Sequence, residues 1–195
     1  MGQDKDLITL PVPLEEHIEV AAAFYTEFMI ALGMPINDET VDTPKRIARM
    51  FSTDFSSFRK NPPQVALFNR QMYDQYIVIK DIQFSSLCEH HHLPFIGVAH
   101  VGYHPDQWLA GLSKVPRVVQ HFAGRPQLQE HLTVQIADYL FEQLKPFGVM
   151  VVIEASHSCM SCRGIRDPRS RTYTSKFLGK VDKSEMLALM RGFNG

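Results

Sequence analysis

The sequence predicts an α+β protein in which one antiparallel sheet carries helices on one of its faces. Apolar segments rich in β-branched residues read as strands, and amphipathic segments with capping residues read as helices. Their order in the main part of the chain is two strands, two helices and two strands. Because the two helices fall together between the two pairs of strands, an antiparallel sheet with both helices on one face is the natural packing.

An N-terminal helical extension precedes this unit. An amphipathic helix is expected over about Leu14–Leu32, since Gly33 suits its C-cap and Pro35 prevents its continuation. A second helix is expected from Thr43-Pro44, with threonine as the N-cap and proline at the first helical position, to about Phe58.

The boundary is predicted at Asn61-Pro62-Pro63, which gives an extension over residues 1–60 and a main domain over 61–195. In the main domain the strands are expected near Gln75–Leu87, Phe95–Tyr103, Val149–Cys159 and Thr172–Phe177, and the helices near Ser113–Ala123, Gln127–Leu144 and Lys183–Met190.

Composition excludes several classes of function. The chain has 195 residues, 45% of them hydrophobic, with a formal charge of −1 and a pI of about 6.7. A nucleic-acid partner is not expected, because there is no excess of cations to neutralise many phosphates. No apolar run approaches the ~20 residues of a membrane span, and Met1–Asp6 lacks the pattern of a signal peptide. A reducing, cytoplasmic location is expected, which keeps thiolates available for metal.

Two short segments contain most of the residues that bind metals. Cys88–His92 and His157–Cys162 hold all three cysteines and four of the nine histidines. Cys88 and His91 have a C-x-x-H spacing, so a tight turn can present a thiolate and an imidazole to one ion at roughly 2.3 and 2.0 Å. If the strand before the second segment runs on, His157 and Cys159 project from one face and add a second thiolate.

Three interpretations of these segments compete. Cys159 and Cys162, together with Cys88 and His91, have the spacing of a closed structural Cys₃His zinc site. The pair Cys159 and Cys162 is alternatively a thiol redox pair, although redox C-x-x-C motifs open a helix after a strand and this one is expected to end a strand.

The third interpretation is an open site, in which Cys88, His91 and Cys159 bind zinc and water takes the fourth position. His90 and His157 then stand beside the metal as proton carriers. A structural site needs no spare histidines, so their presence favours the catalytic interpretation.

A candidate anion site follows at the start of a predicted helix. Ser113 suits its N-cap, and Pro116 is tolerated only in a first helical turn. Lys114 and Arg117, three residues apart, then share a face at the positive end of the helix dipole, where phosphates bind. Arg163, four residues after Cys159, is a further candidate for a polyphosphate. The alternative is an ordinary solvated helix start.

Glu130 and Gln129 open the next predicted helix. A carboxylate can accept two hydrogen bonds from the N1–H and N2 amino edge of guanine, with Gln129 as a neighbouring amide. Glu130 is equally suited to a surface position that complements the helix dipole. The spacing of the sequence leaves both interpretations open.

Four ordered motifs combine these candidates: Cys88-Glu89-His90-His91, Gly111-Leu112-Ser113-Lys114 with Arg117, Gln127-Leu128-Gln129-Glu130 with Leu132-Thr133, and His157-x-Cys159-Met160 with Arg163-Gly164. Together they resemble the GTP cyclohydrolase I family, zinc enzymes that convert GTP to 7,8-dihydroneopterin triphosphate and formate, the first step of pterin and folate biosynthesis. The resemblance runs from about Thr43 to the C-terminus and implies the tunnelling fold, with its ββααββ order.

The resemblance implies roles for individual residues. It makes Cys88, His91 and Cys159 the ligands of Zn²⁺, and it leaves Cys162 incidental. It places catalysis on His157, which would protonate N7 of the purine, on His90 as the other proton carrier, and on Ser113 near the ribose. The implied GTP-binding residues are Glu130 and Gln129 at the guanine, Lys114, Arg117 and Arg163 at the triphosphate, and Arg46 at a neighbouring subunit's site.

The resemblance also implies a homo-oligomer, a decamer of two stacked pentamers with active sites between subunits. Sheet edges without partners in a single chain agree with this. Two alternatives remain open on the sequence: a structural Cys₃His zinc domain, and a tunnelling-fold protein that binds purines or pterins without turning over GTP.

Overall fold

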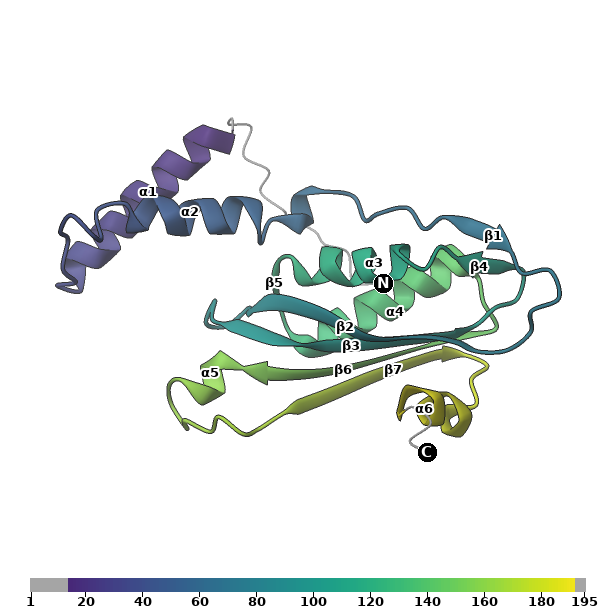
Figure 1. Cartoon of the computed structure of the whole chain (residues 1–195). Coiled ribbons are helices and arrows are strands. Elements are labelled where there is room, and N and C mark those ends of the chain that lie inside the picture. The colour runs from purple at the N-terminus through teal and green to yellow at the C-terminus, as the bar shows by residue number, and fades with distance from the viewer. Residues whose placement is uncertain (1–13, 192–195) are drawn as a thin grey trace. The chain divides into compact units, whose positions relative to one another are not determined.

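A computed structural model describes residues 14–191 of the chain (Figure 1). The chain forms two compact units, Met1–Asp54 and Phe55–Gly195. Part of the predicted extension over residues 1–60, together with the segment tested above for a signal peptide, falls in residues 1–13 and so lies outside the described residues. Within the described part, no helix is both long and apolar enough to cross a membrane.

The first unit is a pair of helices, α1 (Leu14–Ala31) and α2 (Thr43–Thr53). Ile18 and Ala22 of α1 pack against Ala48 of α2. The predicted first helix is confirmed to within one residue.

The second predicted helix differs from expectation at both ends. Thr43 was expected to be its N-cap but is its first helical residue, and the cap position belongs to Asp42. The helix ends at Thr53 rather than near Phe58, and a separate 3₁₀ turn, η1 (Ser57–Arg59), opens the second unit.

The second unit contains a five-stranded sheet with the order β5-β2-β3-β6-β7. The four long strands pair in antiparallel fashion, as predicted, and β5 adds a short parallel pair at the end of β2. The strands are β2 (Ile77–Cys88), β3 (Pro94–His104), β5 (Pro126–Gln127), β6 (Gly148–His157) and β7 (Thr172–Gly179).

Helices α3 (Lys114–Ala123) and α4 (Gln129–Leu144) cover one face of this sheet (Figure 1). Their apolar sides bury a core against alternate residues of β3 and β6, such as Phe95, Val101 and Tyr103. The final helix, α6 (Lys183–Arg191), packs on the other face, where the absent side chain of Gly102 leaves room for Met186. The predicted α+β class and ββααββ order are therefore confirmed.

Two features were not foreseen. A small second sheet joins β1 (Leu67–Asn69) to β4 (Trp108–Ala110). More important for function, β6 ends at His157, and the next residues form the four-residue helix α5 (Ser158–Ser161). The prediction that Cys159 extends the strand and projects from the same face as His157 is therefore wrong.

The pairing register brings three chain segments together where the strands end, at one end of the sheet. Leu87 at the end of β2 pairs with Pro94 at the start of β3, and Phe95 pairs with His157 at the end of β6. The turn between β2 and β3 therefore lies beside the junction of β6 and α5. Both metal-binding segments of the sequence meet there.

A glycine permits close pairing of β3 and β6 next to this end of the sheet. A Cβ atom on Gly97 would lie 2.0 Å from the carbonyl oxygen of Glu154 and 2.7 Å from the Cβ atom of Ala155. We predict that Gly97→Ala forces the strands apart, at a cost of about 1–3 kcal/mol. The midpoint of thermal unfolding should fall by several degrees. Gln83→Ala, at an exposed position on neighbouring β2, is the control and should change stability by no more than about 0.5 kcal/mol; equal midpoints for the two variants would contradict the prediction.

Candidate metal centre

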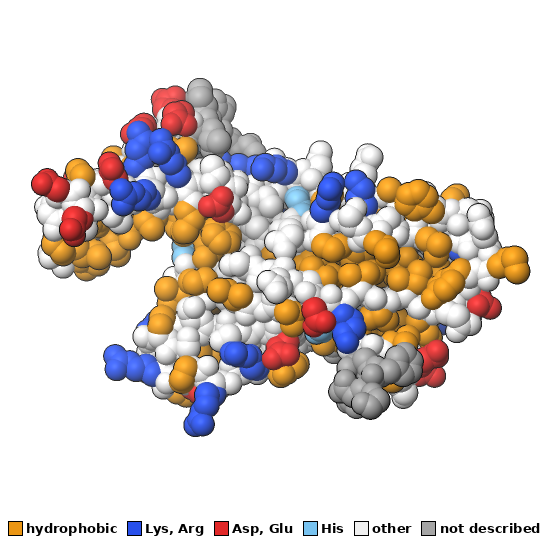
Figure 2. All heavy atoms as spheres, in the orientation of Figure 1, with side chains coloured by type: hydrophobic (Ala, Val, Ile, Leu, Met, Phe, Trp, Pro, Cys, Tyr) orange, Lys and Arg blue, Asp and Glu red, His pale blue; other side chains and the backbone are white. Residues whose placement is uncertain are grey.

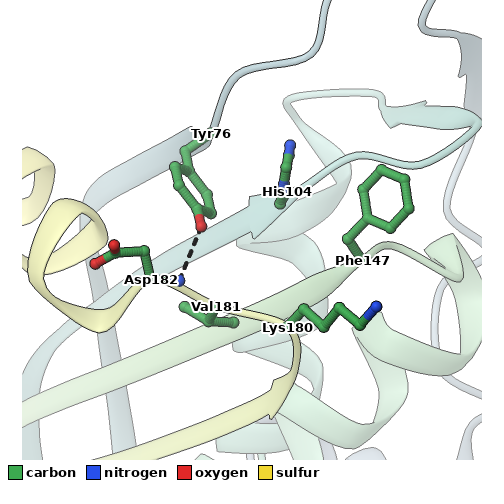
Figure 3. A pocket seen from close by; sticks show the side chains of 6 residues that line it. All are labelled: Tyr76, His104, Phe147, Lys180, Val181 and Asp182. Atoms are coloured by element: carbon green, nitrogen blue, oxygen red, sulfur yellow. Dashed lines mark hydrogen bonds between the residues drawn. The ribbon is translucent and has the colours of Figure 1, made fainter.

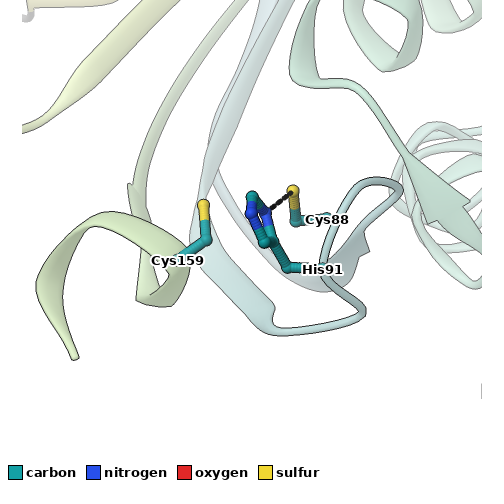
Figure 4. Close-up of side chains that lie close together, drawn as sticks. All are labelled: Cys88, His91 and Cys159. Atoms are coloured by element: carbon teal, nitrogen blue, oxygen red, sulfur yellow. Dashed lines mark hydrogen bonds between the residues drawn. The ribbon is translucent and has the colours of Figure 1, made fainter. Parts of the chain in front are cut away.

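Cys88, His91 and Cys159 converge at the end of the sheet described above (Figure 4). One potential ligand atom from each residue lies within 4.8 Å of the other two. Cys88 is buried, Cys159 is half-buried and His91 is exposed. The group thus sits at the surface with one side open to solvent.

A tight turn after β2 presents Cys88 and His91, the first two candidate ligands. The amides of His91 and His92 both donate to the carbonyl oxygen of Cys88, at 3.2 and 2.8 Å, and the amide of Cys88 donates to Leu93 at 2.8 Å. His92 takes a left-handed conformation with φ 52°, which closes the turn. The C-x-x-H spacing therefore acts as predicted.

The third candidate ligand, Cys159, comes from the helical turn α5. The amide of Cys162 donates to the carbonyl oxygen of Ser158 at 3.0 Å, which closes this turn. Cys159 is therefore presented by a helix that follows a strand, so the prediction that the Cys159-x-x-Cys162 pair ends a strand, which spoke against a thiol redox pair, is wrong. Cys162 is exposed and is not a member of the metal-binding group in the part of the chain that the structure describes.

The geometry and the donor types fit zinc. In a tetrahedral zinc site with Zn–S of about 2.3 Å and Zn–N of about 2.0 Å, neighbouring ligand atoms are roughly 3.5–3.8 Å apart. Cys88 Sγ and His91 Nδ1 lie 3.7 Å apart. Three described ligands with one side exposed correspond to the open type of site rather than to a closed Cys₃His site.

The two neighbouring thiols affect each other's ionisation. Burial raises the pKa of the Cys159 thiol, and the neighbouring Cys88 thiol raises it further, while Arg163 acts in the opposite direction. Two thiols this close resist ionisation together, and a coordinated divalent ion removes that conflict because it deprotonates its thiol ligands. Arg163 also donates from Nη1 to His91 Nε2, at 3.1 Å.

His157 lies beside the centre in a well-defined setting. Its ring stacks on Phe95, with centroids 4.7 Å apart and planes 5° from parallel. Burial lowers the pKa of His157, and the negative charge of Glu130 partly offsets this. His90 is exposed and meets His91 edge to face at 6.2 Å.

The side chains of Gln129 and Glu130 lie in different environments. Gln129 is buried, and its side-chain amide is hydrogen-bonded to His157 and to three acceptors of β6 and β7. Glu130 is exposed at the first turn of α4 and close enough to His157 to influence its charge.

The predicted anion-binding residues lie at the first turn of α3. Ser113 stands at the N-cap position, as predicted, but its hydroxyl makes no capping hydrogen bond. Lys114 is half-buried, and Arg117 is exposed one turn further on. Arg46 belongs to the first unit, where it is exposed and lies 3.6 Å from Asp42.

A pocket of about 520 Å³ lies at the opposite end of the sheet (Figure 3). Its walls include Tyr76, which precedes β2, and His104, which ends β3, with Phe147 and Lys180 beside them. β2 runs from this pocket to the metal centre, and its twelve residues span roughly 35–40 Å. The pocket is therefore separate from the chemistry of the centre.

Comparison with known proteins agrees with the geometry. The family model described as GTP cyclohydrolase I matches residues 21–191. The GTP cyclohydrolase 1 of Sulfurihydrogenibium sp. is 50% identical over 155 residues, which cover 78% of this chain and 81% of the relative. That of Streptococcus pyogenes is 45% identical over 178 residues, 88% and 91% of the two chains. A solved archaeosine synthase QueF-Like has a TM-score of 0.43 and 16% identity and covers 56% of this chain and 98% of its own.

The two nearby cysteines provide a direct test of the metal centre. Cys159→Ser should lose most of the bound zinc, because it removes one of three converging ligands, whereas Cys162→Ser should retain about one zinc per subunit. Metal content of the purified variants, measured by elemental analysis, checks both expectations. Equal loss in the two variants would instead show the closed four-ligand site.

Proposed function

The chain belongs to the GTP cyclohydrolase I family, and from this membership we propose that its Cys88–His91–Cys159 centre carries out the family's reaction. GTP is opened at the imidazole ring of guanine, formate is released, and the product is 7,8-dihydroneopterin triphosphate. The observation that carries the proposal is the convergence of three ligand atoms within 4.8 Å of one another at an open end of the sheet.

The resident metal is proposed to be Zn²⁺, held by Cys88, Cys159 and Nδ1 of His91. Two thiolates and an imidazole are the donor set that zinc prefers over magnesium or calcium. When bound, zinc supplies a water whose pKa is lowered to about 7, and thus a nucleophile for C8 of the purine at neutral pH. The free thiols that this requires fit a reducing, cytoplasmic location.

His157 is proposed to protonate N7 of the purine. The imidazole ring of guanine is a poor electrophile, and protonation at N7 makes C8 more receptive to attack. His157 is suited to this because it lies two residues from Cys159 and its ring is fixed against Phe95. His90, exposed next to His91, is the proposed carrier for the later proton transfers.

Glu130 is proposed to bind the guanine base, because its carboxylate can accept hydrogen bonds from N1–H and the N2 amino group. Its electrostatic effect on His157 supports this role, because a guanine held by Glu130 would lie near that ring. Ser113, whose hydroxyl does not cap its own helix, is proposed to lie near the ribose.

Lys114, Arg117 and Arg163 are proposed to hold the triphosphate. The first two stand at the positive end of α3. When His91 Nδ1 is a metal ligand, Nε2 carries the ring's proton and can no longer accept the hydrogen bond from Arg163. The guanidinium of Arg163 is then free to bind phosphate.

A decamer of two stacked pentamers is proposed as the working form, with Arg46 reaching a neighbouring subunit's site. Strand β7 and most of β2 have an unpaired edge within the described residues. Hydrophobic side chains also form broad areas on the face shown in Figure 2, and α1 exposes large residues such as Phe24 and Phe28. Such edges and areas are commonly covered by association.

Incubation with GTP tests the function itself. The zinc-loaded protein should release formate and form a pterin that becomes fluorescent on oxidation, and a chelator that strips zinc should abolish both. Binding of GTP without either product would instead support a purine-binding protein of altered chemistry.

Replacement of His157 separates proton transfer from metal binding. His157→Ala should reduce pterin formation by at least about 100-fold, since general acid–base groups contribute about 10²–10⁴, while zinc content stays near one per subunit. Pterin formation at the wild-type rate would remove His157 from the proposed mechanism.

The role of Glu130 is tested by Glu130→Gln. This variant keeps the shape of the side chain but replaces one acceptor oxygen with a donor, so we expect the KM for GTP to rise at least about tenfold. Zinc content and thermal stability should not change, because Glu130 is exposed. An unchanged KM would assign Glu130 to the ordinary helix surface.

A further inference from the structure

We propose that Gln129 is a positioning residue that fixes His157 with a proton on Nε2, so that Nδ1 is the nitrogen that exchanges protons with the substrate. The inference rests on the proposed function, because it names the atom through which His157 works and the residue that selects this atom. It gives Gln129 a role in turnover rather than in binding guanine.

The orientation of the Gln129 amide is determined by two backbone carbonyls. Its Nε2 atom lies 3.2 Å from the carbonyl oxygen of Ile153 and 3.0 Å from that of Thr172, with the hydroxyl of Thr174 at 3.1 Å. Carbonyl oxygens only accept hydrogen bonds, so the NH₂ group must face them. The reverse orientation would place the amide oxygen against two other oxygens in a buried position, where repulsion is costly.

This orientation of the amide determines which ring nitrogen of His157 carries the proton. The Oε1 atom of Gln129 lies 2.7 Å from His157 Nε2. An amide oxygen can only accept, so the hydrogen in this contact belongs to Nε2 of the ring. In the neutral ring the lone pair is therefore on Nδ1, which has no hydrogen-bond partner within the described residues 14–191.

Neighbouring groups hold both partners in place. Thr133 donates from its hydroxyl to the backbone carbonyl of Gln129 at 2.7 Å, so the hydroxyl of Thr174, 2.6 Å away, donates to Thr133. Gln129 and Thr133 are each only 2% exposed. Buried networks of this kind are rigid when their members are paired. The stacked ring of Phe95 fixes the plane of His157 as well.

The arrangement serves both protonation states of the ring. When His157 is charged, both nitrogens carry protons, and the proton on Nδ1 passes to N7 of the purine while its bonding electron pair stays on Nδ1. The ring that remains is the neutral Nε2–H form, which Gln129 already accepts. Neither residue has to turn during the transfer, which avoids a reorganisation step.

Three variants test the proposal in the complete zinc-loaded enzyme. Gln129→Met keeps the shape but cannot accept a hydrogen bond, and Gln129→Glu restores an acceptor for His157 while losing donors to the carbonyls. Gln127→Met is the matched control: Gln127 is 4% exposed and donates to Phe122 and Gln135, without contact to His157. For each variant kcat, the KM for GTP, zinc content and melting temperature are measured.

We expect Gln129→Met to lower kcat about 10–100-fold, the loss typical of groups that orient a working histidine. The KM should stay within about threefold, and zinc should be retained. Gln129→Glu should recover about threefold of the lost kcat and stay below wild type, because its carboxylate restores the acceptor but adds a charge, although it is no more stable than Gln129→Met. Gln127→Met should lose stability but keep kcat within about threefold, since the hydrogen bonds of its side chain go to Phe122 and Gln135 and not to His157 or Gln129.

Three results would overturn the proposal. A rise in KM at constant kcat would show that Gln129 binds guanine directly. A kcat that follows melting temperature across all three variants would show a purely structural role, and a kcat for Gln129→Met within threefold of wild type would show no role in turnover. Failure of the wild-type enzyme to form pterin would count against the proposed function and not against the positioning of His157.

A spectroscopic measurement tests the same geometry without turnover. In the wild-type protein at a pH where the ring is neutral, ¹⁵N resonances assigned to His157 by comparison with His157→Ala should show one form, protonated at Nε2. Gln129→Met should show a mixture of both forms. A wild-type ring protonated at Nδ1 would disprove the proposal even if both variants failed to fold.

Discussion

The antiparallel pairing of β3 with β6 is the constraint on which the functional centre depends. This pairing places His157 opposite Phe95, and the pairing of β2 with β3 places the Cys88 turn next to them. Residues about seventy positions apart in the chain thereby place potential ligand atoms close to one another. Bringing such distant segments together lowers the conformational entropy of the chain. Burial of the apolar core beneath the sheet, rather than the polar centre, offsets this loss.

The elements of the fold were largely predictable because their signals are local. Periodicity and capping residues located α1, α3, α4 and the four long strands to within a few residues. The end of β6 was missed because Ser158–Ser161 is a single helical turn, too short for any periodicity to show. The short strands β1 and β4 were missed for the same reason, since each is only three residues long.

In the candidate centre, too, the local features were predictable from the sequence and the long-range ones were not. The C-x-x-H turn was predictable because both its ligands and its hydrogen bonds lie within six residues. The setting of Gln129 was not, because its acceptors come from residues 24 and 43 positions further along the chain. The sequence shows only that the Gln129 amide precedes Glu130, and this position suggests that Gln129 binds the substrate. Only the folded chain shows that its polar atoms face inward to the sheet and to His157.

The choice of an amide to orient His157 has an electrostatic reason. Carboxylates often hold a histidine in one protonated form, but they also add a negative charge. Glu130 already brings a negative charge close to His157, and the Cys159 thiol lies two residues further along the chain. A further carboxylate there would strengthen the hold on the ring's second proton and would oppose ionisation of the thiols. In the proposed arrangement Gln129 fixes the geometry of the ring without adding charge, and no further carboxylate opposes the lowering of the His157 pKa by burial.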